Sequence, residues 1–196
     1  MKRLPIRLVI PDTGVLISLA HGNLLEQILN FTEDVRLTIT DAAAYEATHR
    51  QDLADAQRVR EFIGRNKNRI TVEPTAFHSL VEEAAQDASR DKHLPKNMGE
   101  ISAYGYLNEL RNDEPGIPAL IIFEDEWFLK NQYTRPRNTH LLSMVAFLKY
   151  MAGVDPKFSF EDAMDSIKAT RPGVNTINID IPAESKTTWK PKVRKP

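Results

Sequence analysis

The sequence predicts an α/β protein of three layers, in which a mostly parallel central sheet lies between helices. Short apolar runs rich in β-branched residues alternate with longer segments of helical spacing over residues 1–153. Strands that alternate with helices favour parallel pairing, because each helix carries the chain back across the sheet. A chain of 196 residues with 41% hydrophobic residues is sufficient for one such domain.

Four segments are predicted as strands, and each ends at a residue that interrupts regular structure or carries a charge. Residues 6–10 form an apolar run that ends at Pro11 and Asp12. Residues 119–123, with the sequence ALIIF, are closed by the acidic run 124–126. The two other predicted strands are residues 35–40 and 70–72.

Helices are predicted where apolar residues recur every third or fourth position. Asp41 is the expected N-cap of the helix that carries Glu46, since aspartate accepts hydrogen bonds from the free N–H groups of a first turn. The predicted helical segments are 15–20, 24–29, 41–49, 52–66, 75–90, 99–112, 139–153 and 160–170.

The composition divides the chain into three regions. Residues 1–153 hold the alternating strands and helices, and residues 154–181 are predicted to be a helical extension packed on that domain. Residues 182–196 contain three prolines, five basic side chains and one acidic side chain. We expect this last region to be a flexible basic tail that aids solubility. The alternative is a contact with nucleic acid or a partner, with Trp189 available for stacking.

The composition also excludes several classes of protein. The chain has no cysteine, so disulfides, cysteine zinc sites and thiol catalysis are excluded. No apolar run reaches the length of a transmembrane helix, and the short apolar stretch near the basic N-terminus leads into Pro11 rather than a cleavage site. We therefore expect a cytoplasmic protein without membrane contact. The histidines lack the spacing of zinc ligands, and no glycine-rich nucleotide-binding motif is present.

Four acidic residues are expected to meet at one edge of the sheet. Asp12 follows the first predicted strand and Asp125 follows the last, and side chains beyond the carboxyl ends of neighbouring parallel strands share a crevice. Glu46 and Glu100 lie near the starts of two predicted helices. Converging carboxylates repel one another unless a proton or a cation neutralises them, and Mg²⁺ or Mn²⁺ prefers such oxygen ligands.

Each of these residues also has a purely structural interpretation. Asp12 and Asp125 suit the N-cap of a helix, and Glu100 suits a first helical turn, where it complements the helix dipole. Glu46 suits a solvated surface position. The ordered set is more specific than its members, because chance matches are frequent for one short motif and rarer for four in order.

The order of these segments resembles that of the PIN-domain nucleases, which include the VapC-type toxins of bacteria. The matching segments span residues 8–153 and are LVIPDTGVLISLA, ITDAAAYEATHR, NMGEISAYGYL, ALIIFEDEWFL and THLLSMVAFLKYMAG. The resemblance implies a PIN-like nuclease domain over residues 1–153 that cleaves RNA phosphodiester bonds with Mg²⁺ or Mn²⁺.

The resemblance also assigns roles to individual residues and suggests partners. Asp12, Glu46, Glu100 and Asp125 correspond to the catalytic, metal-binding acids, and Thr13 corresponds to a supporting hydroxyl. Many members of the family form homodimers and are inhibited by a cognate antitoxin protein. A homodimer, an antitoxin and an RNA substrate are therefore the expected partners.

The chain departs from the family in three ways. Phe123 stands two residues before the fourth acid, where the family usually has threonine or serine. Glu124 and Glu126 flank Asp125, so the fourth ligand could be shifted by one residue. The chain is also longer than a typical toxin of this group, which bears on a toxin role more than on nuclease chemistry.

Nucleic-acid binding requires a local basic patch, because the net charge of the chain is −1. Lys130, Arg135 and Arg137 follow the fourth acid and are candidates for contacts with an RNA backbone, with a solvated basic segment as the alternative. A second basic stretch, residues 58–69, suits the solvated face of an amphipathic helix.

Three functions remain open from the sequence. The first is a metal-dependent endoribonuclease, with toxin activity as one possible use. The second is a catalytically weak PIN module that binds RNA or a protein partner, although the retention of all four acids argues against it. The third is a nuclease for DNA or for a particular nucleic-acid structure, since no residue in the sequence separates RNA from DNA.

Overall fold

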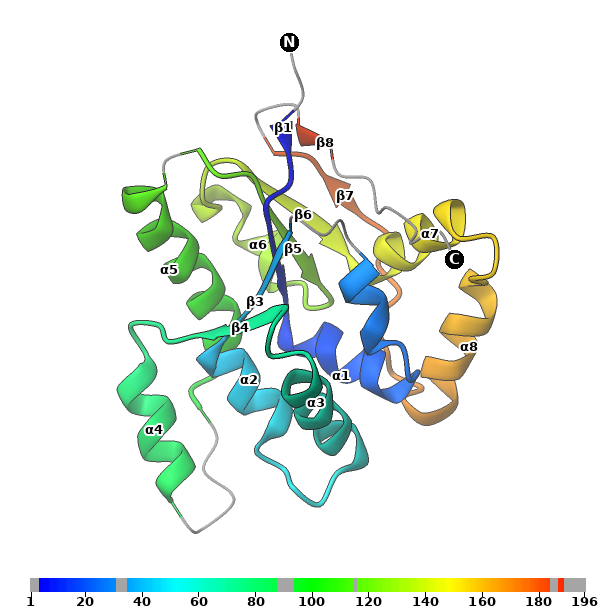
Figure 1. The fold of residues 1–196 in the computed structure, drawn as a ribbon, viewed down its shortest axis with the longest axis horizontal. Helices are drawn as coiled ribbons and strands as arrows, with labels where there is room; N and C mark the ends of the chain where they lie inside the picture. The colour runs from blue at the N-terminus through cyan, green and yellow to red at the C-terminus, as the bar shows by residue number, and fades with distance from the viewer. Residues whose placement is uncertain (1–3, 31–34, 88–93, 115, 184–186, 189–196) are drawn as a thin grey trace.

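A six-stranded sheet runs through the centre of the protein (Figure 1). The structure, a computed structural model, describes residues 4–30, 35–87, 94–114, 116–183 and 187–188. The strands of this sheet are β2 (Leu8–Pro11), β3 (Arg36–Thr40), β4 (Ile70–Glu73), β5 (Ala119–Phe123), β6 (Thr139–Ser143) and β7 (Asp180–Ile181). They lie in the order β4-β3-β2-β5-β6-β7, and neighbours are parallel except for the antiparallel pair β6–β7.

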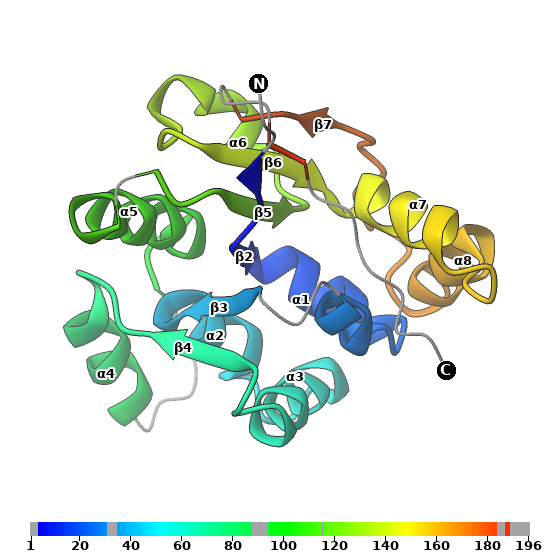
Figure 2. The same ribbon diagram turned by 45° about the horizontal axis from the view of Figure 1, so that its top comes forward.

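Helices cover both faces of the sheet, which confirms the predicted three-layer α/β/α fold. The helices are α1 (Thr13–His21), η1 (Leu25–Asn30), α2 (Asp41–Thr48), α3 (Ala54–Arg65), α4 (His78–Gln86), α5 (Met98–Asp113), α6 (Trp127–Lys130), η2 (Gln132–Thr134), α7 (Met144–Val154) and α8 (Phe160–Thr170). In Figure 2, α1, α3, α7 and α8 lie on one side of the strands and α4, α5 and α6 lie on the other. Among these described helices, none combines the length and the apolar character required to cross a bilayer.

Alternate residues along each strand supply the two halves of the core. Along β2, Val9 belongs to the larger apolar cluster, whereas Leu8 and Ile10 belong to the smaller one. Along β5, Leu120 and Ile122 face the larger cluster. Successive side chains of a strand point to opposite faces, so these strands are apolar on both faces, as expected of a parallel sheet that is covered on both sides.

The segment 139–153, predicted above as one helix, is a strand followed by a helix. The prediction is wrong for Thr139–Ser143, which forms β6 beside β5, and α7 begins only at Met144. Ser143 marks the boundary, because its hydroxyl accepts a hydrogen bond of 3.2 Å from the N–H of Ala146. An apolar run as short as THLLS does not reveal its own period, so the free edge of β5 decides in favour of a strand.

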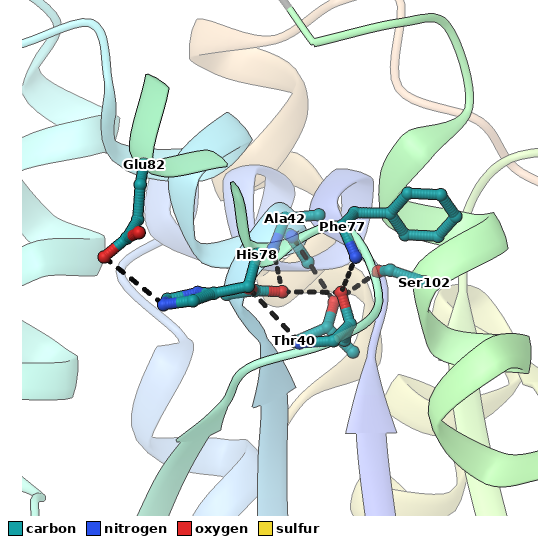
Figure 3. Close-up of polar contacts among 9 residues, drawn as sticks. Thr40, Ala42, Phe77, His78, Glu82 and Ser102 are labelled. Carbon is teal, nitrogen blue, oxygen red and sulfur yellow. Dashed lines mark hydrogen bonds and ion pairs between the residues drawn. The ribbon is translucent and has the colours of Figure 1, made fainter. Parts of the chain in front are cut away.

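The prediction that Asp41 caps α2 is also wrong. Thr40 holds the N-cap position, and its hydroxyl accepts a hydrogen bond of 3.4 Å from a first-turn N–H. The carboxylate of Asp41 accepts a hydrogen bond of 2.9 Å from the Thr75 hydroxyl and lies 3.0 Å from Nδ1 of His78. Figure 3 shows His78, which also contacts Glu82. Asp41 therefore fastens the start of α4 to α2.

The region 154–181, predicted as a helical extension, contains the helix α8 and the edge strand β7. The helix α8 lies against α1, where a Cβ atom added at Gly22 would stand 2.6 Å from Cγ1 of Ile167. The hydroxyl of Ser166 donates to the carbonyl of Gly22 over 3.2 Å. The extension is thus joined to the domain both at the sheet edge and along α1.

Much of the predicted tail lies outside the described residues. These undescribed parts are 184–186 and 189–196, which include Trp189. The described pair Thr187–Thr188 forms β8, which pairs in parallel with β1 (Leu4–Pro5) in a separate two-stranded sheet.

Arginines of the second basic stretch stabilise the ends of helices. Nη1 of Arg58 donates a 2.8 Å hydrogen bond to the carbonyl of Ala20 near the end of α1. Arg60 donates in the same way to the carbonyl of Thr48, the last residue of α2. Carbonyls at a helix end lack a partner within the helix, and a cation complements the negative end of the helix dipole. These two arginines therefore tie α3 to α1 and α2.

We expect Arg60→Met to lower the free energy of unfolding by about 1–2 kcal/mol, because it removes a charge-assisted hydrogen bond to the end of α2. Arg65→Met is the matched control on the same helix: the Arg65 side chain is exposed and lies 3.7 Å from Glu26, so its loss should change stability by less than about 0.5 kcal/mol. Urea unfolding of the two variants measures the difference. Equal losses would show that the Thr48 contact contributes nothing.

Candidate metal centre

The pairing of β2 with β5 brings two of the four acids to the same edge of the sheet. Pro11 is in register with Ile122, and the N–H of Asp12 donates to the carbonyl of Ile122 over 2.8 Å. Asp125 follows Ile122 by three residues, in the turn that leaves β5. The strands are neighbours, as the convergence of Asp12 and Asp125 requires.

Glu46 bridges two helices that begin at this edge. Its carboxylate accepts a hydrogen bond of 2.8 Å from the Thr13 hydroxyl, at the start of α1. It accepts a second bond of 3.3 Å from the N–H of Gly99, at the start of α5. Glu100 is the next residue of α5, so Glu46 is held close to the first turn that carries Glu100. Glu46 is therefore not a freely solvated surface residue.

A polar link fixes α2 against α5. The hydroxyl of Thr40, at the N-cap of α2, lies 2.7 Å from the hydroxyl of Ser102 on α5 (Figure 3). The Ser102 hydroxyl donates to the carbonyl of Gly99 over 2.7 Å. Both hydroxyls are buried. This link sets the distance between the helix that carries Glu46 and the helix that carries Glu100.

All four acids and Thr13 line one open cavity of about 670 Å³. The other lining residues include acidic, basic and amide side chains from the turn after β5, from the start of α5 and from the C-terminal extension. They are Gly14, Ile17, Lys96, Asn97, Glu124, Glu126, Trp127, Lys130, Arg171 and Asn175. The cavity is large enough for a nucleotide-sized group, and its lining is mostly polar.

Asp12 lies at the N-cap position of α1, yet capping does not explain it. Its side chain makes no capping hydrogen bond to α1. Oδ2 accepts a 3.4 Å hydrogen bond from the N–H of Glu124, directly after β5. Oδ1 is buried and has no hydrogen-bond partner among the described residues, and the whole residue is only 4% exposed. A buried carboxylate oxygen without a partner is costly, so it is a position where a ligand is expected.

Burial raises the pKa of three of these carboxylates, and neighbouring negative charge adds to the shift of two of them. Desolvation raises the pKa of Asp12 well above its ordinary value, and the charges of Glu100 and Asp125 act in the same direction. Desolvation likewise raises the pKa of Glu100 to about 7, aided by the charges of Glu46 and Asp125. Desolvation raises the pKa of Glu46, against the hydrogen bond from Thr13. Each of these groups therefore favours a proton or a nearby cation.

The three consecutive acids after β5 have different partners. Glu124 is 7% exposed and forms an ion pair of 3.2 Å with Arg171. Glu126 pairs with Lys130 at 2.9 Å. Asp125 is exposed, and its Oδ1 accepts a 2.6 Å hydrogen bond from the N–H of Trp127. The capping interpretation of Asp125 is wrong, because Glu126 holds the N-cap position of α6. Because both neighbours have cationic partners, Asp125 is the best candidate for the fourth ligand.

Of the three basic residues predicted to contact nucleic acid, only Lys130 lines the cavity. Lys130 lines the cavity, and Lys96, which the sequence did not single out, lines it too. Arg135 donates to the carbonyl of Pro182 over 3.4 Å, and the carbonyl of Arg137 accepts a 3.0 Å bond from Nε of Arg111. Among the described residues that line the cavity, neither Arg135 nor Arg137 is present.

The donor set fits a hard divalent cation such as Mg²⁺ or Mn²⁺, which binds carboxylate oxygens. Asp12, Glu46, Glu100 and Asp125 would hold it, and the unpartnered Oδ1 of Asp12 is the strongest sign of such a ligand. In the described part of the chain, no three acidic or histidine side chains already form a ligand set. Glu46 and Asp125 are held by hydrogen bonds within the protein, which orient their carboxylates and leave lone pairs for a cation.

Comparisons of the chain with protein-family models, with curated proteins and with solved structures find no match in any of the three. The resemblance of the sequence motifs to PIN-domain nucleases therefore remains a prediction. The geometry and the charge of the cavity are the basis for a functional proposal.

Gly99 lies where α1, α2 and α5 approach one another closely, so there is no room for a side chain. The sequence motif alone did not reveal this reason for the glycine. A Cβ atom at Gly99 would lie 2.6 Å from Oε2 of Glu46 and 2.7 Å from Oγ1 of Thr13. We expect Gly99→Ala to destabilise the protein by about 1–3 kcal/mol and to weaken Mn²⁺ binding about tenfold, because Glu46 must move. Melting curves and Mn²⁺ titration measure the two effects.

Gly105→Ala is the matched control for that variant. Gly105 is on the same helix, and a Cβ atom there would meet no atom within 4 Å. We expect this change to raise stability by up to about 1 kcal/mol, because alanine favours a helix over glycine, and to leave Mn²⁺ binding unchanged. If Gly99→Ala behaved like Gly105→Ala, the packing around Glu46 would not matter.

The raised pKa of Glu100 predicts how the metal-free protein responds to pH. Between its ordinary value of 4.5 and about 7, the folded protein holds a proton that the unfolded chain has lost. This contribution is complete below about pH 4.5 and is lost as the pH rises through about 7. Allowing for solvent screening, we expect a loss of about 1–2 kcal/mol.

Glu100→Gln should remove this part of the pH dependence, because glutamine does not titrate. Urea unfolding in EDTA between pH 5 and pH 8, at intervals of about one unit, measures the difference between wild type and variant. Saturating Mn²⁺ should flatten the wild-type dependence as well, since a cation stabilises the ionised carboxylate. An identical slope in wild type and variant would contradict the assignment to Glu100.

Proposed function

We propose that the protein is a metal-dependent endoribonuclease of the PIN type, with Mg²⁺ or Mn²⁺ held by Asp12, Glu46, Glu100 and Asp125. The observation that carries this proposal is the buried Oδ1 of Asp12, which has no partner among the described residues and lies at a cavity that the other three acids also line. Carboxylates that serve only stability are normally paired. A cation would supply the missing charge.

A divalent ion held by these four acids would activate water for attack on a phosphodiester and would stabilise the negative charge that develops on the phosphate. The side chains of this chain bind and orient the participants. The Thr13 hydroxyl holds the carboxylate of Glu46 in place. Lys96 and Lys130 lie on the cavity lining, where ammonium groups suit the phosphates of a bound strand. Lys130 also pairs with Glu126, so a phosphate would share it with that carboxylate.

The choice of RNA as substrate and the possible toxin role come from the resemblance of the motifs to PIN-domain nucleases. An antitoxin partner and a homodimer have the same origin. The acidic cavity supports hydrolysis of a phosphodiester and is neutral between RNA and DNA, so the first experiment includes both substrates.

We expect the wild-type protein to cleave RNA with Mg²⁺ or Mn²⁺ and to lose this activity in EDTA. Asp12→Asn should lower the rate at least about 100-fold, because it removes the most buried metal ligand. Asp165→Asn, the same chemical change on the exposed side of α8, should leave the rate unchanged. The assay uses mixed RNA and single-stranded DNA, with melting curves as a check of folding.

In metal-free buffer, Asp12→Asn should be at least as stable as the wild type, because one of the repelling charges is gone. Cleavage of single-stranded DNA alone would replace RNA by DNA as the substrate. A folded wild-type protein that binds RNA without cutting it would contradict the nuclease proposal and favour a binding module. Cleavage that survives both EDTA and Asp12→Asn would contradict the metal centre.

A further inference from the structure

One arginine of the C-terminal extension reaches the cavity from outside the alternating domain. Arg171 directly follows α8, and its Nη2 lies 3.2 Å from Oε1 of Glu124. Its Nη1 lies 3.3 Å from the second carboxylate oxygen of Glu124 and donates to the carbonyl of Gly14 over 3.0 Å. It also donates to the hydroxyl of Ser18. The guanidinium therefore joins the extension, α1 and the turn after β5.

The carboxylate of Glu124 is fully engaged by these contacts. Besides the ion pair with Arg171, Oε2 accepts a 2.5 Å bond from the Ser18 hydroxyl and Oε1 accepts a 3.3 Å bond from the N–H of Asn175. Glu124 lies on the lining of the cavity, but both of its carboxylate oxygens are occupied by the contacts with Arg171, Ser18 and Asn175. It is thus a carboxylate beside the candidate metal centre that is withdrawn from metal binding.

Glu124 is connected to two of the proposed ligands through its backbone. Its N–H donates to Oδ2 of Asp12 over 3.4 Å, and Asp125 is the next residue. Any movement of Glu124 therefore changes the position of both acids. The packing of α8 on α1 gives Arg171 a rigid base, because the side chain of Ile167 is fully buried one turn before it.

We propose that Arg171 is a positioning residue for the metal centre: it holds Glu124 away from the cation and so fixes Asp12 and Asp125 for binding. This inference rests on the proposed function. A buried carboxylate that loses its cationic partner is strongly destabilised. Without Arg171, Glu124 would turn toward the open cavity and draw the turn that carries Asp125 with it.

If Arg171 acted only through its charge, its removal would change the affinity for the cation in the opposite direction. Removal of Arg171 makes the cavity more negative, so attraction alone would tighten the binding of a cation. A positioning role predicts weaker binding in spite of the added negative charge. The direction of the change therefore separates the two explanations.

The test is a titration of the full-length protein with Mn²⁺, in which free Mn²⁺ is measured by electron paramagnetic resonance. We expect Arg171→Met to raise the Kd about tenfold, as is typical when a residue that orients metal ligands is lost. The double variant Arg171→Met/Glu124→Gln should recover most of the affinity, because no unpaired charge remains to displace the turn. Arg36→Met, which breaks the exposed 3.2 Å pair with Glu114, should change nothing.

The outcomes separate this inference from the proposed function. If the wild type binds no Mn²⁺, the metal centre itself fails and the inference fails with it. If the wild type binds Mn²⁺ but folded Arg171→Met binds equally or more tightly, only the role of Arg171 is overturned. If Arg171→Met does not fold in EDTA, Arg171→Lys decides. Lysine keeps the positive charge but cannot make the bidentate contact with Glu124. A Mn²⁺ affinity equal to that of the wild type would therefore overturn the inference.

Discussion

Where β2 and β5 leave the sheet, the N–H of Asp12 donates to the carbonyl of Ile122, and the N–H of Glu124 donates back to the carboxylate of Asp12. This pair of hydrogen bonds fixes a carboxyl group in a buried position between two parallel strands. The surrounding elements are arranged around that group. Thr13 and Gly99 anchor Glu46 beside it, and the extension compensates Glu124 on its other side.

The acids on the two sides of Asp12 differ in how well the protein neutralises their charge. On the side of the extension, Glu124 meets a guanidinium, a hydroxyl and a backbone N–H, so its charge is neutralised by the protein. On the side of the cavity, the Glu46 carboxylate accepts hydrogen bonds from a hydroxyl and a backbone N–H, and among the described contacts no lysine or arginine forms an ion pair with Glu46 or Glu100. A fold that neutralises one buried acid so completely and leaves its neighbours without a cation makes a proton or a bound cation favourable at those neighbours.

The fold class and the placement of the four acids follow from local rules, whereas the rest depends on distant contacts. Alternating strands and helices predict the parallel sheet, and the rule about strand ends predicts that Asp12 and Asp125 approach. The period of Thr139–Ser143 is hidden in five residues, so only the edge of β5 shows that it is a strand. Arg171 had no recognisable local pattern, because its partners lie far away in the chain.

The contact between Arg171 and Gly14 joins residues that are 157 positions apart. During synthesis, Asp12 and Glu46 leave the ribosome long before α8 is made, and domains fold as their segments become available. A nascent chain can pair β2 with β3 early, but the turn after β5 is secured only after the extension has emerged and packed on α1. The contacts that Arg171 makes with Gly14 and Glu124 are thus among the last in the domain to form.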